Sequence, residues 1–362
     1  MKVVHIIGRF TTGGAEIFLK DLACELNHLK DVKLEVWALS KSNNKNFEQK
    51  YISKLQENDI KVKVFDKRHK KDKIKTIIKL RKEIRKSNPS IINCHLEEVT
   101  FFTCIANLFT GIPIVQTIHN CKISLPKIQK LFLRYIIDKY IAISESVKSI
   151  LIEEIKIKES QIEVIFNGIK ISKFENNSRK IDGKVFNIVS VGRLTEQKNH
   201  ELLIKAFAKL IKQNDIKDIP KLSIYGDGEL KDRLAKTIFE HKVENYIELK
   251  GISNNISDIL KSSDIYIMSS LWEGLSISLI EASISGIPII ATNVGSNHEI
   301  ILDGVNGYLI NCNEEELIKA IKKMFDINTR KYFNEMSYIN KKKFDIKNTA
   351  KEYYAAYSRL IK

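Results

Sequence analysis

The chain has 362 residues, of which 43% are hydrophobic, so two domains with full hydrophobic cores are expected. Its five cysteines are odd in number and show no CxxC spacing, which favours a reducing cytoplasm and argues against a structural zinc site. The net charge is +16, but no helix-turn-helix, zinc-finger or RNA-binding aromatic pattern accompanies the basic residues, so nucleic-acid binding is the least favoured explanation of that charge.

The first half of the chain alternates short β-branched runs with amphipathic patterns. The N-terminus is predicted to be a buried strand rather than a signal peptide, and no window reaches the roughly 18 apolar residues of a membrane-spanning helix. Residues 15–29 place their apolar side chains on one helical face. A second helix is predicted to share a face among Ile74, Ile77, Ile78 and Ile84, with Lys and Arg opposite. The predicted strands are Lys2–Ile7, Lys33–Leu39, Ile60–Phe65, Ile91–His95, Ile114–Ile118, Lys139–Ile143 and Ile162–Phe166.

Basic residues are concentrated in this half of the chain. Residues 1–170 carry a net charge of +12, and the run Lys67–Lys86 holds eleven basic and two acidic residues. Besides nucleic-acid binding, two explanations stay open for this run. It is either a solvated, lysine-rich helix face or a surface that docks on an anionic membrane, where each basic residue gains about 1 kcal/mol.

A polar bridge, Asn167–Lys184, separates the two halves, and the second half restarts the alternation. We therefore expect an N-terminal domain over residues 1–168, a second domain over 169–345 and a closing aromatic-bearing helix over 346–362. The predicted strands of the second half are Val185–Val191, Lys221–Tyr225, Tyr246–Leu249, Ile265–Met268, Ile287–Ala291 and Gly307–Ile310. The predicted helices are Asn199–Asn214, Glu229–His241, Ser276–Ser285, Glu314–Asp326 and Ile346–Ile361.

This alternation is typical of the α/β class: two Rossmann-like, doubly wound domains, each with a parallel sheet and helices on both faces. In such sheets ligands bind at the carboxyl ends of the strands, where the strand order reverses. With two such domains, the natural ligand site is the cleft between them.

The segment Asp264–Glu299 carries the strongest functional signal. It is predicted to run strand, turn, helix and strand, with the carboxylates of Glu273 and Glu281 eight positions apart. Ser276 and Ser278 suit a helix start because a hydroxyl can satisfy an unpaired backbone N–H. A helix that opens after a glycine-containing turn is an anion site. Carboxylates bind hydroxyls and the helix start binds phosphate, so the segment suits a sugar nucleotide.

Two cations stand in the loop after strand Val185–Val191. Arg193 and Lys198 follow Gly192 and precede the helix predicted from Asn199. A diphosphate is bound best by two cations that reach it together, one of them a planar fork. Each charge-assisted hydrogen bond contributes about 1.5–3 kcal/mol. The alternative is a surface loop with incidental charge.

Other strand-end residues have two explanations each. The pair Gly13–Gly14 is either a ligand cradle at a helix start or an ordinary βα turn. His119 is either a pocket or a core histidine. Ser144–Ser146 is more simply a helix cap, and Gly226–Glu229 is more simply a turn than an acidic metal motif.

Taken together, these motifs resemble the retaining glycosyltransferases of family 4, which have the GT-B fold. The spacing of seven residues between Glu273 and Glu281 is the hallmark of that family. The matching segments run in family order along nearly the whole chain: GGAE (13–16), TIHN (117–120), ISES (143–146), VIFNGI (164–169), VGRLTEQKN (191–199), YGDGE (225–229), SSLWEGLSISLIEA (269–282) and GIPIIATNVGSNHEII (286–301).

The resemblance implies how the diphosphate of a sugar nucleotide is held. Gly14 offers its backbone N–H to the donor phosphate. Arg193 and Lys198 neutralise the diphosphate leaving group, and the amides near Ser276–Ser278 cap the phosphate. No bound metal and no other cofactor is expected.

The resemblance also implies how the sugar and the ribose are held. Glu281 accepts hydrogen bonds from the ribose hydroxyls, Glu273 holds the transferred sugar, and His119 touches that sugar. The implied catalytic set is Glu273, His119, Arg193 and Lys198. The implied donor-binding set is Gly14, Arg193, Lys198, Gly226, Glu273, Gly274, Leu275, Ser276, Ile277, Ser278 and Glu281.

The function expected from this resemblance is retaining, metal-independent transfer of a hexose or N-acetylhexosamine from a nucleoside-diphosphate sugar, with UDP favoured. The acceptor is expected to be a saccharide, lipid-linked, in cell-surface polysaccharide synthesis at the cytoplasmic membrane face. A UDP-sugar epimerase and a non-catalytic sugar-nucleotide binder are the alternatives. The chain departs from the family pattern at Asn120, Phe166, Lys170 and Ser276; Asn120 and Lys170 bear on the acceptor side.

Overall fold

The protein was analysed as a computed structural model, which describes residues 1–67, 72–121, 130, 134–174, 181, 183, 185–213, 218–253 and 255–361. The chain forms two compact units, Met1–Lys170 with Lys343–Lys362, and Ile171–Lys342. Residues 68–71 of the basic run and residues 175–180, 182 and 184 of the polar bridge lie outside the described residues. No helix in the described ranges is both long and apolar enough to span a membrane.

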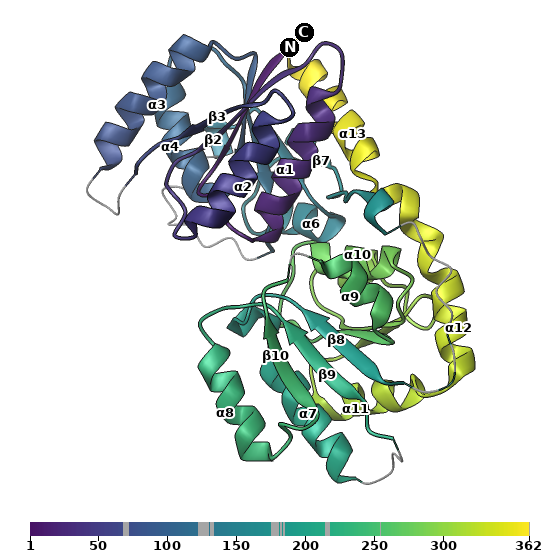
Figure 1. Cartoon of the computed structure of the whole chain (residues 1–362). Coiled ribbons are helices and arrows are strands. Elements are labelled where there is room, and N and C mark those ends of the chain that lie inside the picture. Colours follow the sequence, from purple (N-terminus) through teal and green to yellow (C-terminus); the bar gives the residue numbers. More distant parts are fainter. Residues whose placement is uncertain are drawn as a thin grey trace. The chain divides into compact units, whose positions relative to one another are not determined.

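The first unit is built on a seven-stranded parallel sheet with strand order β3-β2-β1-β4-β5-β6-β7 (Figure 1). The order reverses at β1, which pairs with β2 on one side and with β4 on the other. Four of its strands are completely or almost completely buried, as helices on both faces require. The strands are β1 (Lys2–Ile7), β2 (Lys33–Ala38), β3 (Lys61–Val64), β4 (Ile91–His95), β5 (Ile114–Ile118), β6 (Lys139–Ala142) and β7 (Ile162–Val164).

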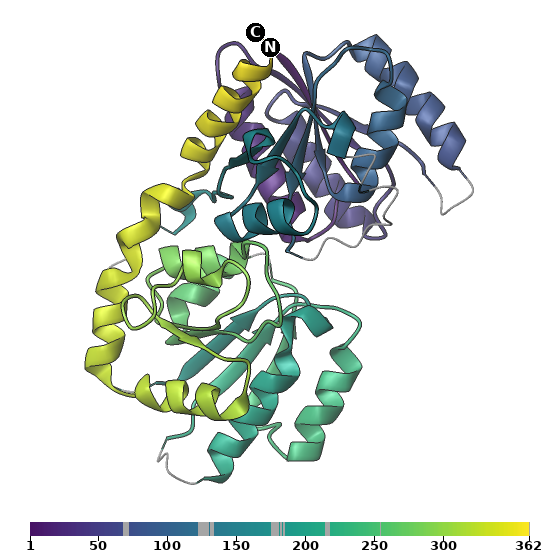
Figure 2. The ribbon, with the colours of Figure 1, turned by 180° about the vertical axis from the view of Figure 1, so that it is seen from behind.

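Helices flank this sheet, and the C-terminal helix joins them (Figures 1 and 2). α13 (Ile346–Leu360) packs against α1 (Gly14–Asn27) and buries Tyr353 and Tyr357 completely. The expected return of the final helix to the first domain is thereby confirmed. The other helices of the unit are α2 (Lys45–Gln56), α3 (Lys73–Ser87), α4 (Glu97–Asn107) and α6 (Glu145–Glu153).

The second unit repeats the design with a six-stranded parallel sheet of order β10-β9-β8-β11-β12-β13. Here the order reverses between β8 and β11, which are neighbours at the centre of the sheet. The strands are β8 (Asn187–Val191), β9 (Lys221–Tyr225), β10 (Ile247–Gly251), β11 (Ile265–Met268), β12 (Ile289–Thr292) and β13 (Tyr308–Ile310). The helices are α7 (His200–Lys212), α8 (Lys231–His241), α9 (Ile256–Ser262), α10 (Ile277–Ile284), α11 (Glu314–Lys323) and α12 (Ile327–Met336).

The two parallel sheets confirm the predicted α/β class, and most boundaries differ from prediction by one or two residues. β12 starts at Ile289 rather than Ile287 because Pro288 has no N–H to give to the sheet. The first unit continues to Lys170, two residues past the predicted end, and resumes at Lys343. There the Ile169 N–H donates to the Phe344 carbonyl at 2.8 Å. This bond joins the segment that leaves the first unit to the segment that returns to it.

The predicted apolar face of α3 is confirmed at Ile84, which is buried, and is wrong at Ile74 and Ile78. The helix buries Thr76, Leu80 and Ile84, whereas Ile74 and Ile78 are 75% and 62% exposed. At about 100° per residue, Ile74 and Ile78 lie on the far side of the helix from Leu80. The buried side of α3 therefore runs through Thr76, Leu80 and Ile84, and the helix packs against α4.

Candidate active site

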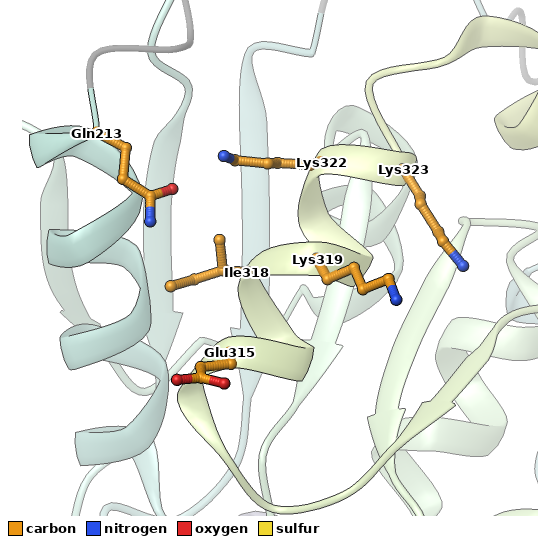
Figure 3. Close-up of a pocket in the computed structure, with 6 residues that line it drawn as sticks. All are labelled: Gln213, Glu315, Ile318, Lys319, Lys322 and Lys323. Carbon is orange, nitrogen blue, oxygen red and sulfur yellow. The ribbon is translucent and has the colours of Figure 1, made fainter.

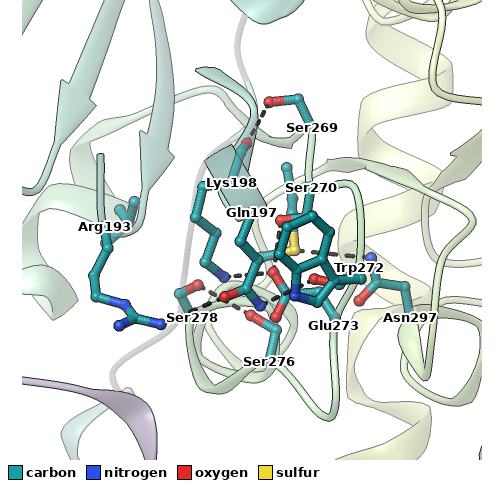
Figure 4. Close-up of polar contacts among 12 residues, drawn as sticks. Arg193, Gln197, Lys198, Ser269, Ser270, Trp272, Glu273, Ser276, Ser278 and Asn297 are labelled. Carbon is teal, nitrogen blue, oxygen red and sulfur yellow. Dashed lines mark hydrogen bonds and ion pairs between the residues drawn. The ribbon is translucent and has the colours of Figure 1, made fainter. Parts of the chain in front are cut away.

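Two loops meet at the carboxyl ends of β8 and β11, where the strand order of the second unit reverses (Figure 4). The backbone N–H of Leu271 donates to the Gln197 carbonyl at 2.8 Å, and the Gln197 side-chain amide donates to the Trp272 carbonyl at 3.0 Å. The Ser269 hydroxyl donates to the Lys198 carbonyl at 3.1 Å. These bonds hold the cation-bearing loop after β8 against the carboxylate-bearing loop after β11.

An ion pair forms where these loops join. Lys198 Nζ donates to Glu273 Oε1 at 2.5 Å, and the Ser270 hydroxyl donates to the same oxygen at 2.6 Å. The two side chains of the pair are only 13% and 6% exposed. A carboxylate this buried needs the cation, because removing Lys198 would leave an uncompensated charge, and the Ser270 hydroxyl adds a hydrogen bond to the same oxygen. The structure therefore brings two predicted catalytic residues, 75 positions apart in sequence, into one contact.

Arg193 lies beside this pair on the same loop but is exposed. One of its Nη atoms donates to Gln197 Oε1 at 3.4 Å, which is the one side-chain hydrogen bond of Arg193 to the described residues. A guanidinium carries five N–H donors, so most of the Arg193 fork is available to an anion. The sequence-predicted pair of cations is thus split into a buried ammonium and an open guanidinium.

Two glycines allow this arrangement. A Cβ at Gly192 would lie 3.2 Å from the Lys198 side chain, so the stem of Lys198 needs the bare backbone to reach Glu273. Gly226, at φ +147°, follows β9, and a Cβ there would lie 1.8 Å from the Gly192 carbonyl. Gly226 therefore allows the loop after β9 to approach the loop after β8 closely, because only glycine tolerates both this φ angle and the short distance.

The N-terminus of α10 lies at the same edge of the sheet, after the loop that follows β11. Ser276 is its N-cap, but the hydroxyl does not cap the helix as predicted; it pairs with the Ser278 hydroxyl at 3.2 Å. Ser278 in turn accepts from the Tyr266 hydroxyl at 3.1 Å. Because the serine oxygens are engaged with each other, no side-chain cap takes the first-turn N–H groups, which stay available for an anion.

The other donor-site candidates of this segment are also located. Gly274 and Leu275 are buried in the turn between Glu273 and the helix, and Ile277 is the first residue of α10. Glu281 is half-buried one turn further along α10. Lys198 contacts Glu273 in the turn before α10, whereas Glu281 lies within the helix, so Glu273 and Glu281 occupy different positions.

The first unit holds the remaining candidates. Gly14 is exposed at the first position of α1, after the N-cap Gly13, and no side chain caps that helix. His119 directly follows β5 and is 9% exposed. Its Nε2 lies 2.9 Å from His95 Nδ1, whereas its Nδ1 is buried with no partner among the described residues. Burial lowers the pKa of His119 to about 4, so the ring is neutral at pH 7.

Two family models match the chain. The model for Glycosyltransferase Family 4 covers residues 12–173, and the model for Glycosyl transferases group 1 covers residues 172–343. Together they span both units, including every strand-end loop described above. The chain is a family 4 glycosyltransferase with the GT-B fold.

Relatives of this glycosyltransferase agree with that assignment. It is 29% identical over 274 residues to UDP-Gal:α-D-GlcNAc-diphosphoundecaprenol α-1,3-galactosyltransferase of Escherichia coli, covering 70% of each chain. It is 31% identical to N-acetylgalactosamine-N,N′-diacetylbacillosaminyl-diphospho-undecaprenol 4-α-N-acetylgalactosaminyltransferase of Campylobacter jejuni, over 54% of this chain and 53% of the relative. The crystal structure of Anabaena HepE in complex with UDP and glucose superposes with a TM-score of 0.85 at 19% identity, covering 99% of this chain and 100% of that chain.

Several predicted motifs of the glycosyltransferase have local structural roles. The Ser144 hydroxyl accepts from the Val147 N–H at 3.1 Å and caps α6, as the simpler explanation held. Asp227 Oδ1 accepts from the Gly228 N–H at 3.0 Å within the predicted turn. In the described ranges no group of three or more His, Cys, Asp or Glu side chains is placed to hold a metal ion.

A surface pocket of about 540 Å³ lies elsewhere, between α7 and α11 (Figure 3). It is lined by Gln213, Glu315, Ile318, Lys319, Lys322 and Lys323. The pocket lies on helices rather than at strand ends, and it includes none of the predicted site residues. We therefore take the loops of Figure 4, and not this pocket, as the candidate active site.

Sequence reasoning missed three residues that shape these sites. Gln197 joins the two loops, Ser270 donates to Glu273, and His95 contacts His119. Gln197 and Ser270 lie inside segments that carried the resemblance, but neither spacing nor residue type indicated their contacts. His95 ends a predicted strand, and that position was the one signal that could have pointed to it.

Proposed function

We propose that the protein is a retaining glycosyltransferase that moves a hexose or N-acetylhexosamine from a nucleoside-diphosphate sugar, with UDP favoured. The acceptor is a saccharide carried on a lipid, in the assembly of a cell-surface polysaccharide. The observation that carries this proposal is the Lys198–Glu273 pair beside the open Arg193 fork and the uncapped start of α10. The E. coli and C. jejuni relatives, named for undecaprenol-linked substrates, and the UDP and glucose in HepE support it.

The pair acts as a carboxylate and a cation that separate when the donor binds. In the free enzyme Lys198 and Glu273 neutralise each other at 2.5 Å. A bound diphosphate draws the ammonium to itself, and Glu273 is then free to accept hydrogen bonds from the hydroxyls of the transferred sugar. As the glycosidic bond breaks, negative charge grows on the diphosphate, where Lys198, Arg193 and the α10 dipole stabilise it.

The remaining donor contacts follow the family pattern. Glu281 accepts from the ribose hydroxyls, and the segment Gly274–Ser278 presents backbone to the phosphate. Gly14 offers its N–H to the same phosphate and His119 contacts the sugar. Gly226 acts by setting the loop approach described above. Fixed cations replace a metal ion in this scheme, so transfer continues in EDTA.

Transfer retains the anomeric configuration through attack on the same face from which the diphosphate leaves. A covalent route would need a carboxylate nucleophile under the anomeric carbon. One oxygen of Glu273 accepts from the Ser270 hydroxyl at 2.6 Å, a contact that does not depend on Lys198, and this bond lowers its nucleophilicity and supports same-face attack. The anomeric configuration of the product, measured by NMR, tests retention.

The lipid-linked acceptor is reached at an anionic membrane surface through α3. Ile74 and Ile78 are exposed there among Lys73, Lys75 and Lys79. An apolar pair flanked by lysines suits the boundary between headgroups and acyl chains, where both kinds of side chain gain free energy.

A thermal-shift panel of UDP-, GDP- and ADP-sugars, each with and without EDTA, tests the donor assignment. Binding raises the melting temperature by mass action, so a UDP-sugar should give the largest shift and EDTA should not reduce it. An epimerase would convert the UDP-sugar to its epimer without acceptor, and a non-catalytic binder would show the shift without transfer. Either result replaces the proposed function.

A further inference from the structure

Three buried histidines form a continuous row across the first sheet. His5 on β1 places Nδ1 2.9 Å from His95 Nε2, and His95 Nδ1 lies 2.9 Å from His119 Nε2. Successive rings are stacked with centroids 5.2 Å apart. The strands β1, β4 and β5 are neighbours, so residues far apart in sequence come into line.

Each ring of the row is neutral and carries one hydrogen. Burial lowers the pKa of His5 to about 3 and that of His119 to about 4, and it holds the pKa of His95 well below its ordinary value. A neutral imidazole donates from one nitrogen and accepts at the other. Every hydrogen bond along the row therefore points the same way, and the direction at one end determines the tautomer at the other.

The direction is set by the C-terminal helix. The Asn93 amide donates to the Tyr357 hydroxyl oxygen at 2.6 Å, while Asn93 Oδ1 accepts from Thr117 at 3.1 Å. The hydroxyl hydrogen of Tyr357 can then be donated to His5 Nε2, 3.4 Å away. With Tyr357 as the donor, His5 donates from Nδ1 to His95, and His95 donates from Nδ1 to His119 Nε2.

The hydrogen of His119 is consequently on Nδ1, the one nitrogen of the row without a partner among the described residues. A buried N–H without an acceptor is costly, so this position calls for a water or ligand oxygen. His119 also lies close to the first turns of α1, because the Phe18 ring packs edge-on against it at 5.9 Å.

We propose that His5, His95 and Tyr357 are positioning residues that hold His119 Nδ1–H as a hydrogen-bond donor to a hydroxyl of the transferred sugar. The identity of that ligand rests on the proposed function, whereas the tautomer does not. The C-terminal helix thus has a second role besides packing: its Tyr357 hydroxyl orients a contact that is three rings away.

The tautomer can be measured directly in the protein without any ligand. Labelling with ¹⁵N-histidine and long-range ¹H–¹⁵N correlation at about pH 7.5 reports which ring nitrogen carries the hydrogen. A His119→Gln variant identifies the His119 signals by their absence. We expect Nδ1–H at His119, and a His119 ring protonated mainly at Nε2 overturns the proposal.

Two matched variants on α13 test the relay. Tyr357→Phe removes the hydrogen bond to His5, so His119 should become a mixture of tautomers, and the Kd for the UDP-sugar should rise about threefold to tenfold while that for UDP is unchanged. Tyr353→Phe is the control: Tyr353 is equally buried, but its hydroxyl contacts Thr117 instead of a histidine. It should change neither quantity.

The outcomes separate the relay from the ligand. An unchanged His119 tautomer in Tyr357→Phe, or an equal change in Tyr353→Phe, refutes the relay. A tautomer change with no change in UDP-sugar affinity refutes the sugar as the acceptor. Failure of the parent to bind any sugar nucleotide refutes the proposed function, and the ligand-free tautomer still tests the relay.

Discussion

Both units of the chain carry polar groups on or just after their central parallel strands, but the two sets of groups differ in charge. The first unit gathers three neutral imidazoles at β1, β4 and β5, fully or almost fully buried. The second unit gathers a buried ion pair, Lys198 with Glu273, beside the exposed Arg193. The imidazoles and the ion pair are both buried, and a titratable group deep in a protein either loses its charge, as the imidazoles do, or pairs with an opposite charge, as Lys198 and Glu273 do. The neutral row can fix the direction of a chain of hydrogen bonds, and the ionic cluster can attract a diphosphate.

The largest expected effect is the loss of stability in acid that the neutral histidine row causes. His5 and His119 have pKa values of about 3 and 4 in the folded protein, against an ordinary value of 6.5 in the unfolded chain, and His95 is also lowered. Below pH 6.5 the unfolded state therefore binds more protons, and the free energy of unfolding falls as pH falls toward 4. At pH 5.5 each histidine costs about 1.4 kcal/mol, so the row costs about 4 kcal/mol.

Urea unfolding at pH 7.5 and 5.5 measures this loss. His119→Gln should remove roughly a quarter of the pH dependence, because His200 in the second unit is also buried and its pKa is lowered to about 3. His28→Gln, at a side chain that is 63% exposed, should leave the pH dependence unchanged. A stability that is level between these pH values would show that the row is not neutral and buried in the folded protein.

Variants of the ionic pair should separate two roles of the second unit, the binding of UDP and the transfer of the sugar. Lys198→Ala should lower the transfer rate roughly 100-fold to 1,000-fold and weaken UDP binding, because the diphosphate loses its buried cation. Glu273→Gln should also abolish most transfer, yet it should bind UDP at least as tightly as the parent, because Lys198 no longer has a carboxylate competing for it.

Calorimetry with UDP and a transfer assay with a UDP-sugar read out both variants. Lys205→Ala is the control, since Lys205 pairs with Glu201 on the surface of α7. Equal loss of UDP affinity in Lys198→Ala and Glu273→Gln would show that the pair acts on UDP as a structural unit.

Arg193→Lys sharpens the comparison further, since it keeps the charge and removes the fork. The guanidinium is exposed and makes one side-chain hydrogen bond at 3.4 Å among the described residues, so the melting temperature should not change. The Kd for UDP should rise about tenfold, because a bidentate contact becomes a single one. An unchanged Kd would remove Arg193 from the diphosphate site.

The smallest expected effect concerns α3. Ile74→Asp with Ile78→Asp should reduce retention on anionic vesicles several-fold at low salt, because both side chains are exposed on a basic helix. Ile77→Asp is not a suitable control, since Ile77 is half-buried. Ile252→Asp is, because Ile252 is 55% exposed in the second unit. Equal retention of all variants, or none by the parent, would contradict membrane docking through α3.

The fold was largely predictable because β-branched runs and amphipathic patterns report burial directly. Periodicity was only partly right at α3, because the predicted face joins the buried Ile84 to the exposed Ile74 and Ile78. The resemblance named Lys198 and Glu273, but a separation of 75 positions gave no sign that they touch. Likewise, His5, His95 and His119 form a row only once the sheet order places β1 beside β4.

A crystal of the protein with an intact UDP-sugar tests the central claim most directly. The account predicts that the diphosphate lies within hydrogen-bond distance of Arg193 and Lys198 at the start of α10, and that Lys198 has moved away from Glu273. A bound UDP-sugar whose diphosphate lies elsewhere, with the Lys198–Glu273 contact still at 2.5 Å, would contradict it.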